Sequence, residues 1–173
     1  LERAETLWQQ RRYQEANNAF GALVDASPKN PDYRVRWGRL FLERFNRRDA
    51  AALFQEALEI KKDHAGALLG LALIAADGFE SKAVELAEQA LKADPKLVES
   101  RELLARLALE DSDTKKAIEE ADKALAISAN ALEAMAIRAT IDWMNDQTET
   151  PWIGRILKQN PRFGKAYAIA GHF

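Results

Sequence analysis

Residues 31–64 read PDYRVRWGRLFLERFNRRDAAALFQEALEIKKDH, and the outline of this stretch recurs along the chain at a step of about 34 residues. Alanine marks the step at intervals of 34, 33 and 34 residues, at Ala16, Ala50, Ala83 and Ala117. A second set of small residues follows the same step, at Ala4, Gly38, Ala72, Ala105, Ala139 and Gly171. A fixed period of this length is typical of stacked helical hairpins, in which each hairpin buries its apolar side against the next.

The composition agrees with helices and excludes several kinds of function. Hydrophobic residues make up 47% of the 173 residues but aromatics only 8%, which favours an alanine- and leucine-rich helical array over a β-sandwich. A net charge of -2 provides no general attraction for nucleic acid or an anionic membrane. The absence of cysteine excludes disulfides and thiolate metal sites. No run of apolar residues is long enough for direct membrane insertion.

Prolines and polar turn residues divide each period into two helices. We expect helices near 1–11, 13–27, 31–45, 47–61, 64–77, 79–93, 96–111, 113–127, 130–145, 150–159 and 162–172. The whole chain, 1–173, is then a single repeat array. Its units are approximately 1–30, 31–64, 65–97, 98–131 and 132–161, and a sixth begins at 162–173.

The residues inside each unit follow a known pattern. The first helix carries a bulky residue and then a small one, as in Trp37-Gly38 and Leu71-Ala72. The second helix carries alanine, an aromatic or small residue four positions on, alanine again and often a closing proline. The matching sets are Ala50, Phe54, Ala57; Ala83, Ala87, Ala90, Pro95; and Ala16, Phe20, Pro28. Lys62 and Ala129 replace the closing proline, and the fifth unit is two residues short.

This pattern resembles the tetratricopeptide repeat. The resemblance implies an all-α fold, a right-handed superhelical solenoid of antiparallel helix hairpins whose first helices line the concave surface. It also implies a protein–protein interaction scaffold that binds a peptide or a partner helix on that surface. The alternative function is a non-catalytic structural or substrate-positioning segment of a larger multidomain enzyme.

Helical spacing selects the first-helix residues that face away from the partner helix. The partner-binding residues predicted in this way are Arg36, Arg39, Leu42, Leu69, Leu73, Arg106, Thr140 and Trp143. Residues 65–76 contain no charged side chain. Either Leu69 and Leu73 form the apolar floor of a groove, or neighbouring units cover this helix completely. A carboxylate clamp is not expected, because Glu99 and Glu102 dilute the inward-facing arginines.

No enzyme activity, catalytic residue, cofactor or metal site is expected. His64 and His172 are 108 residues apart, too far for a metal pair. The acidic run 110–113 lies at a helix–helix turn and lacks the glycine and terminal glutamate of a calcium loop. Glu119 and Glu120 are predicted on the polar outer side of their helix. RNA recognition would require a basic groove, which a chain of net charge -2 does not favour.

The ends of the chain suggest an array that continues. The sequence begins with Leu1, inside a helical pattern, and ends with the apolar run Ile169-Ala170-Gly171-His172-Phe173. Natural arrays end in helices with a polar outer face, so we expect further repeats or another domain after Phe173. Uncapped ends could also pair two chains into a homodimer. The sequence indicates no compartment.

Overall fold

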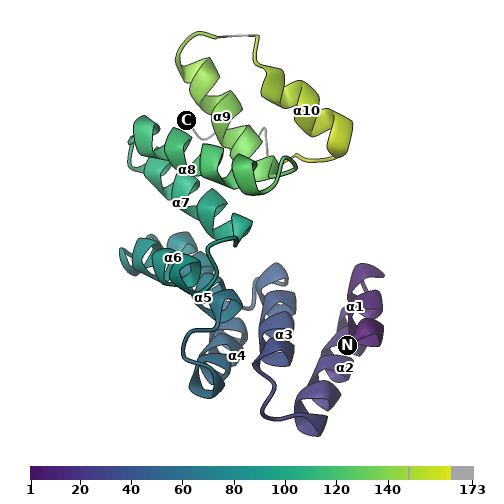
Figure 1. Ribbon diagram of the computed structural model, residues 1–173. Coiled ribbons are helices and arrows are strands. Elements are labelled where there is room, and N and C mark those ends of the chain that lie inside the picture. Colours follow the sequence, from purple (N-terminus) through teal and green to yellow (C-terminus); the bar gives the residue numbers. More distant parts are fainter. Residues whose placement is uncertain (148, 165–173) are drawn as a thin grey trace. The chain divides into compact units, whose positions relative to one another are not determined.

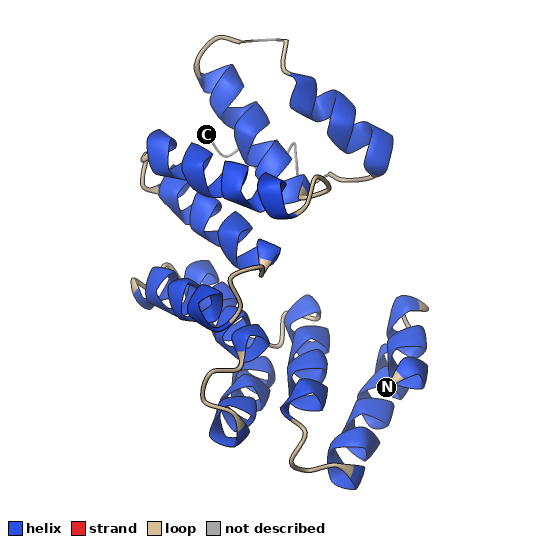
Figure 2. Cartoon of the chain, viewed as in Figure 1, coloured by secondary structure: helices blue, strands red, loops and turns tan. Residues whose placement is uncertain are grey.

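The computed structural model describes residues 1–147 and 149–164 and shows ten helices and no strand within them (Figure 2). The helices are α1 (Glu2–Gln9), α2 (Tyr13–Ala26), α3 (Pro31–Glu43), α4 (Arg47–Ile60), α5 (Ala65–Asp77), α6 (Lys82–Ala93), α7 (Val98–Glu110), α8 (Thr114–Ile127), α9 (Leu132–Met144) and α10 (Pro151–Gln159). Ten of the eleven helices expected from the sequence are therefore present. The eleventh, at 162–172, lies mostly outside the described residues.

The helices pair into hairpins, and the hairpins belong to two compact units (Figure 1). Unit 1, residues 1–95, contains the hairpins α1–α2, α3–α4 and α5–α6. Unit 2, residues 96–173, contains α7–α8 and α9–α10. We call the odd-numbered helices first helices and the even-numbered ones second helices. Each second helix also packs against the first helix of the next hairpin within its unit, as in α2 on α3 and α8 on α9.

Local sequence explains where the helices begin. Asn30 and Asn46 accept hydrogen bonds from backbone amides in the first turns of α3 and α4, and Asp113 does the same for α8. Pro31 and Pro151 occupy the start of their helices, where the missing amide costs nothing. The amides at these helix ends would otherwise lack a partner.

One backbone conformation closes all five described hairpins. In the α3–α4 turn, the amide of Phe45 donates to the carbonyl of Leu42 (3.0 Å) and the amide of Asn46 to that of Phe41 (2.9 Å). The same two bonds recur in the other four turns, which makes each a Schellman motif. Such a motif places one residue at positive φ, the αL conformation. These residues are Arg11, Phe45, Phe79, Ser112 and Asp146, with φ between 54° and 62°.

The α5–α6 turn corrects one predicted boundary. The sequence predicts a helix from residue 79, but α6 begins at Lys82. Phe79 has a φ of 54° and cannot belong to a right-handed helix, although Gly78 immediately before it has a φ of -92°. The glycine that signals the turn in the sequence is therefore not the residue in the αL conformation.

The core of unit 1 contains two completely buried aromatic rings, Phe20 on α2 and Phe54 on α4. Phe54 on α4 is completely buried and lies against Gly38 of α3 and Gly70 of α5. A Cβ at Gly38 would lie 2.7 Å from this ring, and one at Gly70 would lie 2.4 Å from it. Both distances are shorter than van der Waals contact allows, so glycine is required at both positions for Phe54 to fit.

The core of unit 2 contains no buried aromatic ring among the described residues. Alanines of α7 and α8 pack against larger aliphatic side chains of α9 and α10, including Met135, Ile137 and Ile156. These three side chains are no more than 1% exposed. The second helix α10, which has no alanine, is therefore anchored to α9 by Ile156.

Candidate partner-binding surface

First helices lie closer together than second helices within each unit. In unit 1, α3 packs directly against α5, and in unit 2, α7 packs against α9. No two successive second helices make a contact of that extent in the part of the chain that the structure describes. At α3–α5 and at α7–α9 the stack is therefore more tightly packed on its first-helix side. We call the exposed side of α1, α3 and α5 the first-helix surface of unit 1.

A hollow of about 300 Å³ opens where α1 approaches α3. Its lining residues are Glu5, Trp8, Gln9, Arg11, Tyr13, Arg36 and Glu43. Arg36 donates two hydrogen bonds of 2.6 Å to Glu5, and its guanidinium lies 5.2 Å from the centre of the Trp8 ring. This fork of two parallel bonds holds the arginine in one orientation.

Glu43 holds the two aromatic rings of the hollow. It accepts hydrogen bonds from the Trp8 indole Nε1 (2.6 Å) and from the Tyr13 hydroxyl (3.2 Å). Trp8 also packs edge-on against the buried ring of Phe20, with centroids 6.2 Å apart. The polar ends of both rings are thus bound, and guanidinium groups lie over their faces: Arg36 over Trp8 and Arg44, 4.5 Å from the ring centre, over Tyr13. The side chains of the hollow are therefore already ordered, and a partner that binds there would restrict them little further.

The remaining predicted residues of unit 1 divide into accessible and buried ones. Arg36, Arg39, Leu42 and Leu73 are half-buried and can contact a partner. Leu69 is completely buried, so its prediction as a surface residue is wrong. The reason is that α5 packs against α3, α4 and α6, which together surround an apolar helix. For Leu69 the structure agrees with the alternative in which neighbouring helices cover this segment.

In unit 2, Arg106 and Thr140 do not present free polar groups. Arg106 lies between two carboxylates, 4.0 Å from Glu110 and 3.9 Å from Glu133. Thr140 is 2% exposed, and its hydroxyl donates to the carbonyl of Ala136 within α9. The prediction of Thr140 as a binding residue is therefore wrong, because the hydroxyl is buried and satisfied inside its own helix.

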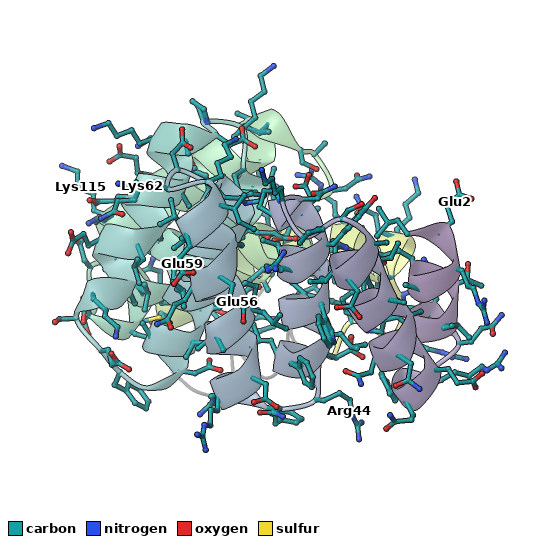
Figure 3. All side chains as sticks on the ribbon, turned by 90° about the horizontal axis from the view of Figure 1, so that it is seen from below. Glu2, Arg44, Glu56, Glu59, Lys62 and Lys115 are labelled. Atoms are coloured by element: carbon teal, nitrogen blue, oxygen red, sulfur yellow. The ribbon has the colours of Figure 1, made fainter. Side chains whose placement is uncertain are left out.

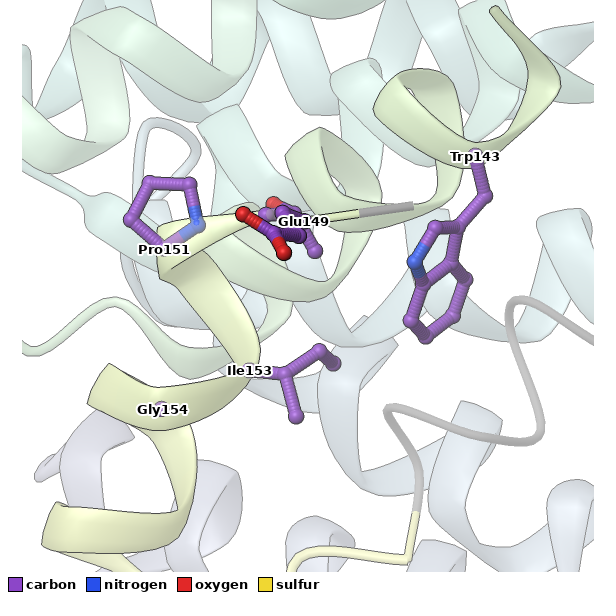
Figure 4. Close-up of a pocket in the computed structure, with 6 residues that line it drawn as sticks. Trp143, Glu149, Pro151, Ile153 and Gly154 are labelled. Atoms are coloured by element: carbon purple, nitrogen blue, oxygen red, sulfur yellow. The ribbon is translucent and has the colours of Figure 1, made fainter. Parts of the chain in front are cut away.

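Trp143 lies at a second hollow, between the end of α9 and the start of α10. This hollow has a volume of about 600 Å³ and is lined by Trp143, Glu149, Thr150, Pro151, Ile153 and Gly154. Figure 4 shows the Trp143 indole and the Ile153 side chain on two sides of the space, with the Glu149 carboxylate above it. Its lining is largely apolar and contains one carboxylate.

Comparison with known families agrees with this architecture. The family model described as "Tetratricopeptide repeat" matches residues 1–44 and 81–131, more than half of the chain. The chain belongs to the tetratricopeptide repeat family. Proteins of this family are generally non-catalytic scaffolds for protein–protein interaction. No curated protein matches the sequence significantly.

Solved tetratricopeptide repeat structures share the solenoid fold with this chain at low sequence identity. TTC0263, a thermophilic protein of Thermus thermophilus, is 14% identical, with a TM-score of 0.81 over 99% of this chain and 95% of that one. The Cut9–Hcn1 hetero-tetramer of the APC/C is 13% identical, with a TM-score of 0.80 over 97% of this chain and 34% of that one. YrrB, described as having an unusual peptide-binding site, is 11% identical, with a TM-score of 0.60 over 95% and 87%.

Two polar residues connect successive tetratricopeptide repeats in a way that the sequence did not indicate. His64 is the N-cap of α5: its Nδ1 accepts from the amide of Ala67 (3.3 Å), and its Nε2 lies 3.0 Å from Asp32 on α3. Glu102 of α7 accepts from the amides of Glu133 and Ala134, at 3.0 and 3.1 Å, and so caps α9. Only the three-dimensional stacking of repeats brings these partners together.

The predicted position of Glu120 is also wrong. This residue is 7% exposed rather than on the polar outer side of α8, because Arg101 of α7 folds over it. Arg101 and Lys123 donate hydrogen bonds of 2.8 and 2.7 Å to its carboxylate. Burial by itself raises the pKa of Glu120, but these hydrogen bonds and the two positive charges outweigh burial and hold the pKa below its ordinary value. Glu119, one residue earlier, is exposed as predicted.

Two kinds of site are not found among the described residues. No group of three or more histidine, aspartate and glutamate side chains is placed to bind a metal ion. In the same ranges, no helix is both long enough and apolar enough to cross a lipid bilayer.

Proposed function

We propose that this chain binds a protein partner, as a peptide or a helix, on the first-helix surface of unit 1. The observation that carries this proposal is the preformed hollow at Trp8 and Arg36. Tryptophan, tyrosine and arginine are the residue types that contribute most to protein–protein affinity when a partner covers them. All three occur here within a single hollow.

The contacts around the hollow favour binding because its side chains are already ordered. Arg36 is held by Glu5, and Trp8 and Tyr13 are held by Glu43. Immobilising a free side chain at an interface costs about 0.5–1.5 kcal/mol, and a preformed site avoids most of this cost. The half-buried Leu42 on α3 and Leu73 on α5 extend the surface with apolar contacts.

The charge of the hollow indicates the kind of partner. Glu5 and Arg36 neutralise each other, and Glu43 accepts from two neutral donors. Arg11 adds one exposed positive charge to the lining. The guanidinium of Arg36 is already paired with Glu5, so it is not available to a carboxylate or phosphate of a partner. The site therefore suits an apolar side chain flanked by hydrogen-bonding groups, as on one face of an amphipathic helix.

A displayed random-peptide library tests this function. The full chain would select peptides, and calorimetry would measure the affinity of a synthetic copy of one of them. Leu42→Glu and Leu73→Glu should each weaken binding at least about tenfold, because each places a charge on the apolar surface. Glu59→Lys on α4 is the matched control, since Glu59, labelled in Figure 3, is exposed.

The outcomes of this test are separable. Circular dichroism would first establish that each variant keeps its helicity and melting temperature. Loss of binding in the two leucine variants alone supports the first-helix surface. Equal binding by all variants, or loss in Glu59→Lys alone, would place the ligand elsewhere and overturn the proposal.

A further inference from the structure

Two phenylalanines of unit 1 project into solvent at hairpin turns. Phe45 and Phe79 are each 88% exposed, whereas no other large apolar side chain among the described residues exceeds 48%. Each occupies the αL position of its turn, with φ of 58° and 54°. For a bulky L-residue this conformation is strained relative to glycine. The packing of the fold gains nothing from either ring, so both are candidates for contact with another molecule.

The positive charge beside Phe45 indicates the chemistry of the site that would bind it. Three arginines flank this residue. Arg44 lies over the ring of Tyr13, at 4.5 Å from its centre, and projects from the molecule in Figure 3. Arg47 pairs with Asp77 at 3.1 Å. Arg48 is exposed and makes no hydrogen bond or ion pair within residues 1–147 and 149–164. The complementary site is therefore an apolar pocket with a carboxylate at its rim.

Unit 2 contains a pocket of this chemistry at the α9–α10 hollow. Trp143, Pro151 and Ile153 supply apolar walls, and the volume of about 600 Å³ is ample for a phenylalanine ring. Glu149 stands at the hollow (Figure 4) and is exposed, with no hydrogen bond or ion pair to the described residues. Its carboxylate is thus available for an incoming guanidinium.

The aromatic turns and this pocket belong to different units of the chain. The unit 2 turns have Ser112 and Asp146 at the αL position, and the run 110–113 before α8 is acidic. Exposed aromatic rings at turns therefore occur in unit 1, and the apolar hollow at a turn occurs in unit 2. Each unit carries the complement of the other.

We propose that the chain binds a second copy of itself head to tail. Phe45 of one copy enters the α9–α10 hollow of the next, Arg48 faces Glu149, and Phe79 covers the rim. The two surfaces differ, so this contact is heterologous and leaves one surface of each kind free at the ends of an assembly. Such contacts build open chains or closed rings. The proposal does not depend on the partner-binding function of the first-helix surface.

Light scattering of the whole chain across a wide range of protein concentration tests the association. The wild type should increase in mass with concentration. The variant Phe45→Gly/Phe79→Gly, which we call the turn variant, should remain monomeric. It should also melt at a higher temperature, because glycine adopts αL without strain. Loss of association therefore cannot result from unfolding. Ser112→Gly is the matched control: it relieves the same strain and should associate like the wild type.

A mixing experiment identifies the hollow as the acceptor. In the hollow variant, Glu149→Lys/Gly154→Arg, the charge is reversed and the mouth is filled. A Cβ added at Gly154 would have no atom within 4 Å, so the side chain is tolerated. Each variant alone should be monomeric. Their equimolar mixture should form dimers and nothing larger, because only one interface between them is intact. A wild type that stays monomeric at every concentration, or a mixture without dimers, would overturn the proposal.

Discussion

The α3–α4 hairpin of unit 1 and the α7–α8 hairpin of unit 2 share one backbone arrangement but fill it differently. In unit 1, Phe54 lies against Gly38 and Gly70. Sixty-seven residues later, the corresponding positions in unit 2 are Ala105, Ala121 and Ile137, all completely buried. In unit 1 the large side chain, Phe54, is on the second helix α4. In unit 2 the large side chain, Ile137, is on the first helix of the following hairpin, α9. In both units one large side chain therefore fills the space between successive hairpins, although different helices supply it.

The largest expected effect comes from removing the large side chain of unit 1. Phe54→Ala should lower the free energy of unfolding of unit 1 by about 3–5 kcal/mol, because it leaves a cavity between α3, α4 and α5. Urea denaturation followed by circular dichroism measures this loss. Phe45→Ala is the matched control, since the same truncation at a ring that is 88% exposed should cost less than about 0.5 kcal/mol. Similar costs at both positions would contradict the packing described for Phe54.

The second prediction transfers the unit 2 arrangement to unit 1. Gly70→Ile alone should destabilise by about 1–3 kcal/mol, because even a Cβ at this position would lie 2.4 Å from the Phe54 ring. In the Phe54→Ala background the same change should stabilise, because isoleucine then fills the cavity as Ile137 does in unit 2. A double-mutant cycle measures the coupling. Additive effects would show that the two side chains do not share one space.

The third prediction concerns the buried carboxylate of Glu120 in unit 2, which binds Arg101 and Lys123. Glu120→Gln should destabilise by about 1–2 kcal/mol near neutral pH, because Arg101 and Lys123 lose a charged acceptor. The pKa of Glu120 is lower in the folded chain, so its contribution is present above the ordinary value of 4.5 and is lost as the pH falls below it. Thermal melts across this range should show less acid sensitivity in the variant.

Glu119→Gln controls for the loss of one carboxylate, since Glu119 also accepts from Lys123, at 2.6 Å, but lies in solvent. Its effect should be within about 0.5 kcal/mol. If both variants changed stability and acid sensitivity equally, the burial of Glu120 beneath Arg101 would have no energetic consequence.

The smallest expected effect concerns Gly154 on α10, whose surroundings differ from those of Gly70 on α5. Open space surrounds the position that a Cβ would take at Gly154 on α10, unlike at Gly70. Gly154→Ala should therefore stabilise unit 2 by about 0.5–1 kcal/mol through helix propensity alone. Differential scanning calorimetry measures the rise in melting temperature. A destabilised Gly154→Ala variant would contradict the open environment of this residue.

The sequence predicted the hairpins, their order and most boundaries, because the alanine period reports directly on helix packing. It could not predict which side chains the stacking covers. Leu69 has the spacing of a surface residue, yet three helices surround it. Glu120 follows a polar pattern, yet an arginine from another helix buries it. The sequence also did not predict the αL conformation at the turns, because none of the five αL residues is glycine.

At the candidate site, the sequence identified Arg36 as a binding residue but did not predict its contacts with other side chains. Its fork to Glu5 and its position over Trp8 depend on α1 approaching α3. Glu43 was not singled out, because its role is to bind Trp8 and Tyr13 from two other helices. Contacts between repeats, and not spacing within one helix, determine which polar residues form the hollow.

Hydrogen–deuterium exchange of the whole chain, with and without the selected peptide, tests the central claim most directly. We expect slower exchange on binding in α1, α3 and α5, centred on the segments that contain Trp8 and Arg36, with little change in α2, α4 and α6. Protection confined to the second helices, or spread evenly over the chain, would contradict a partner site on the first-helix surface.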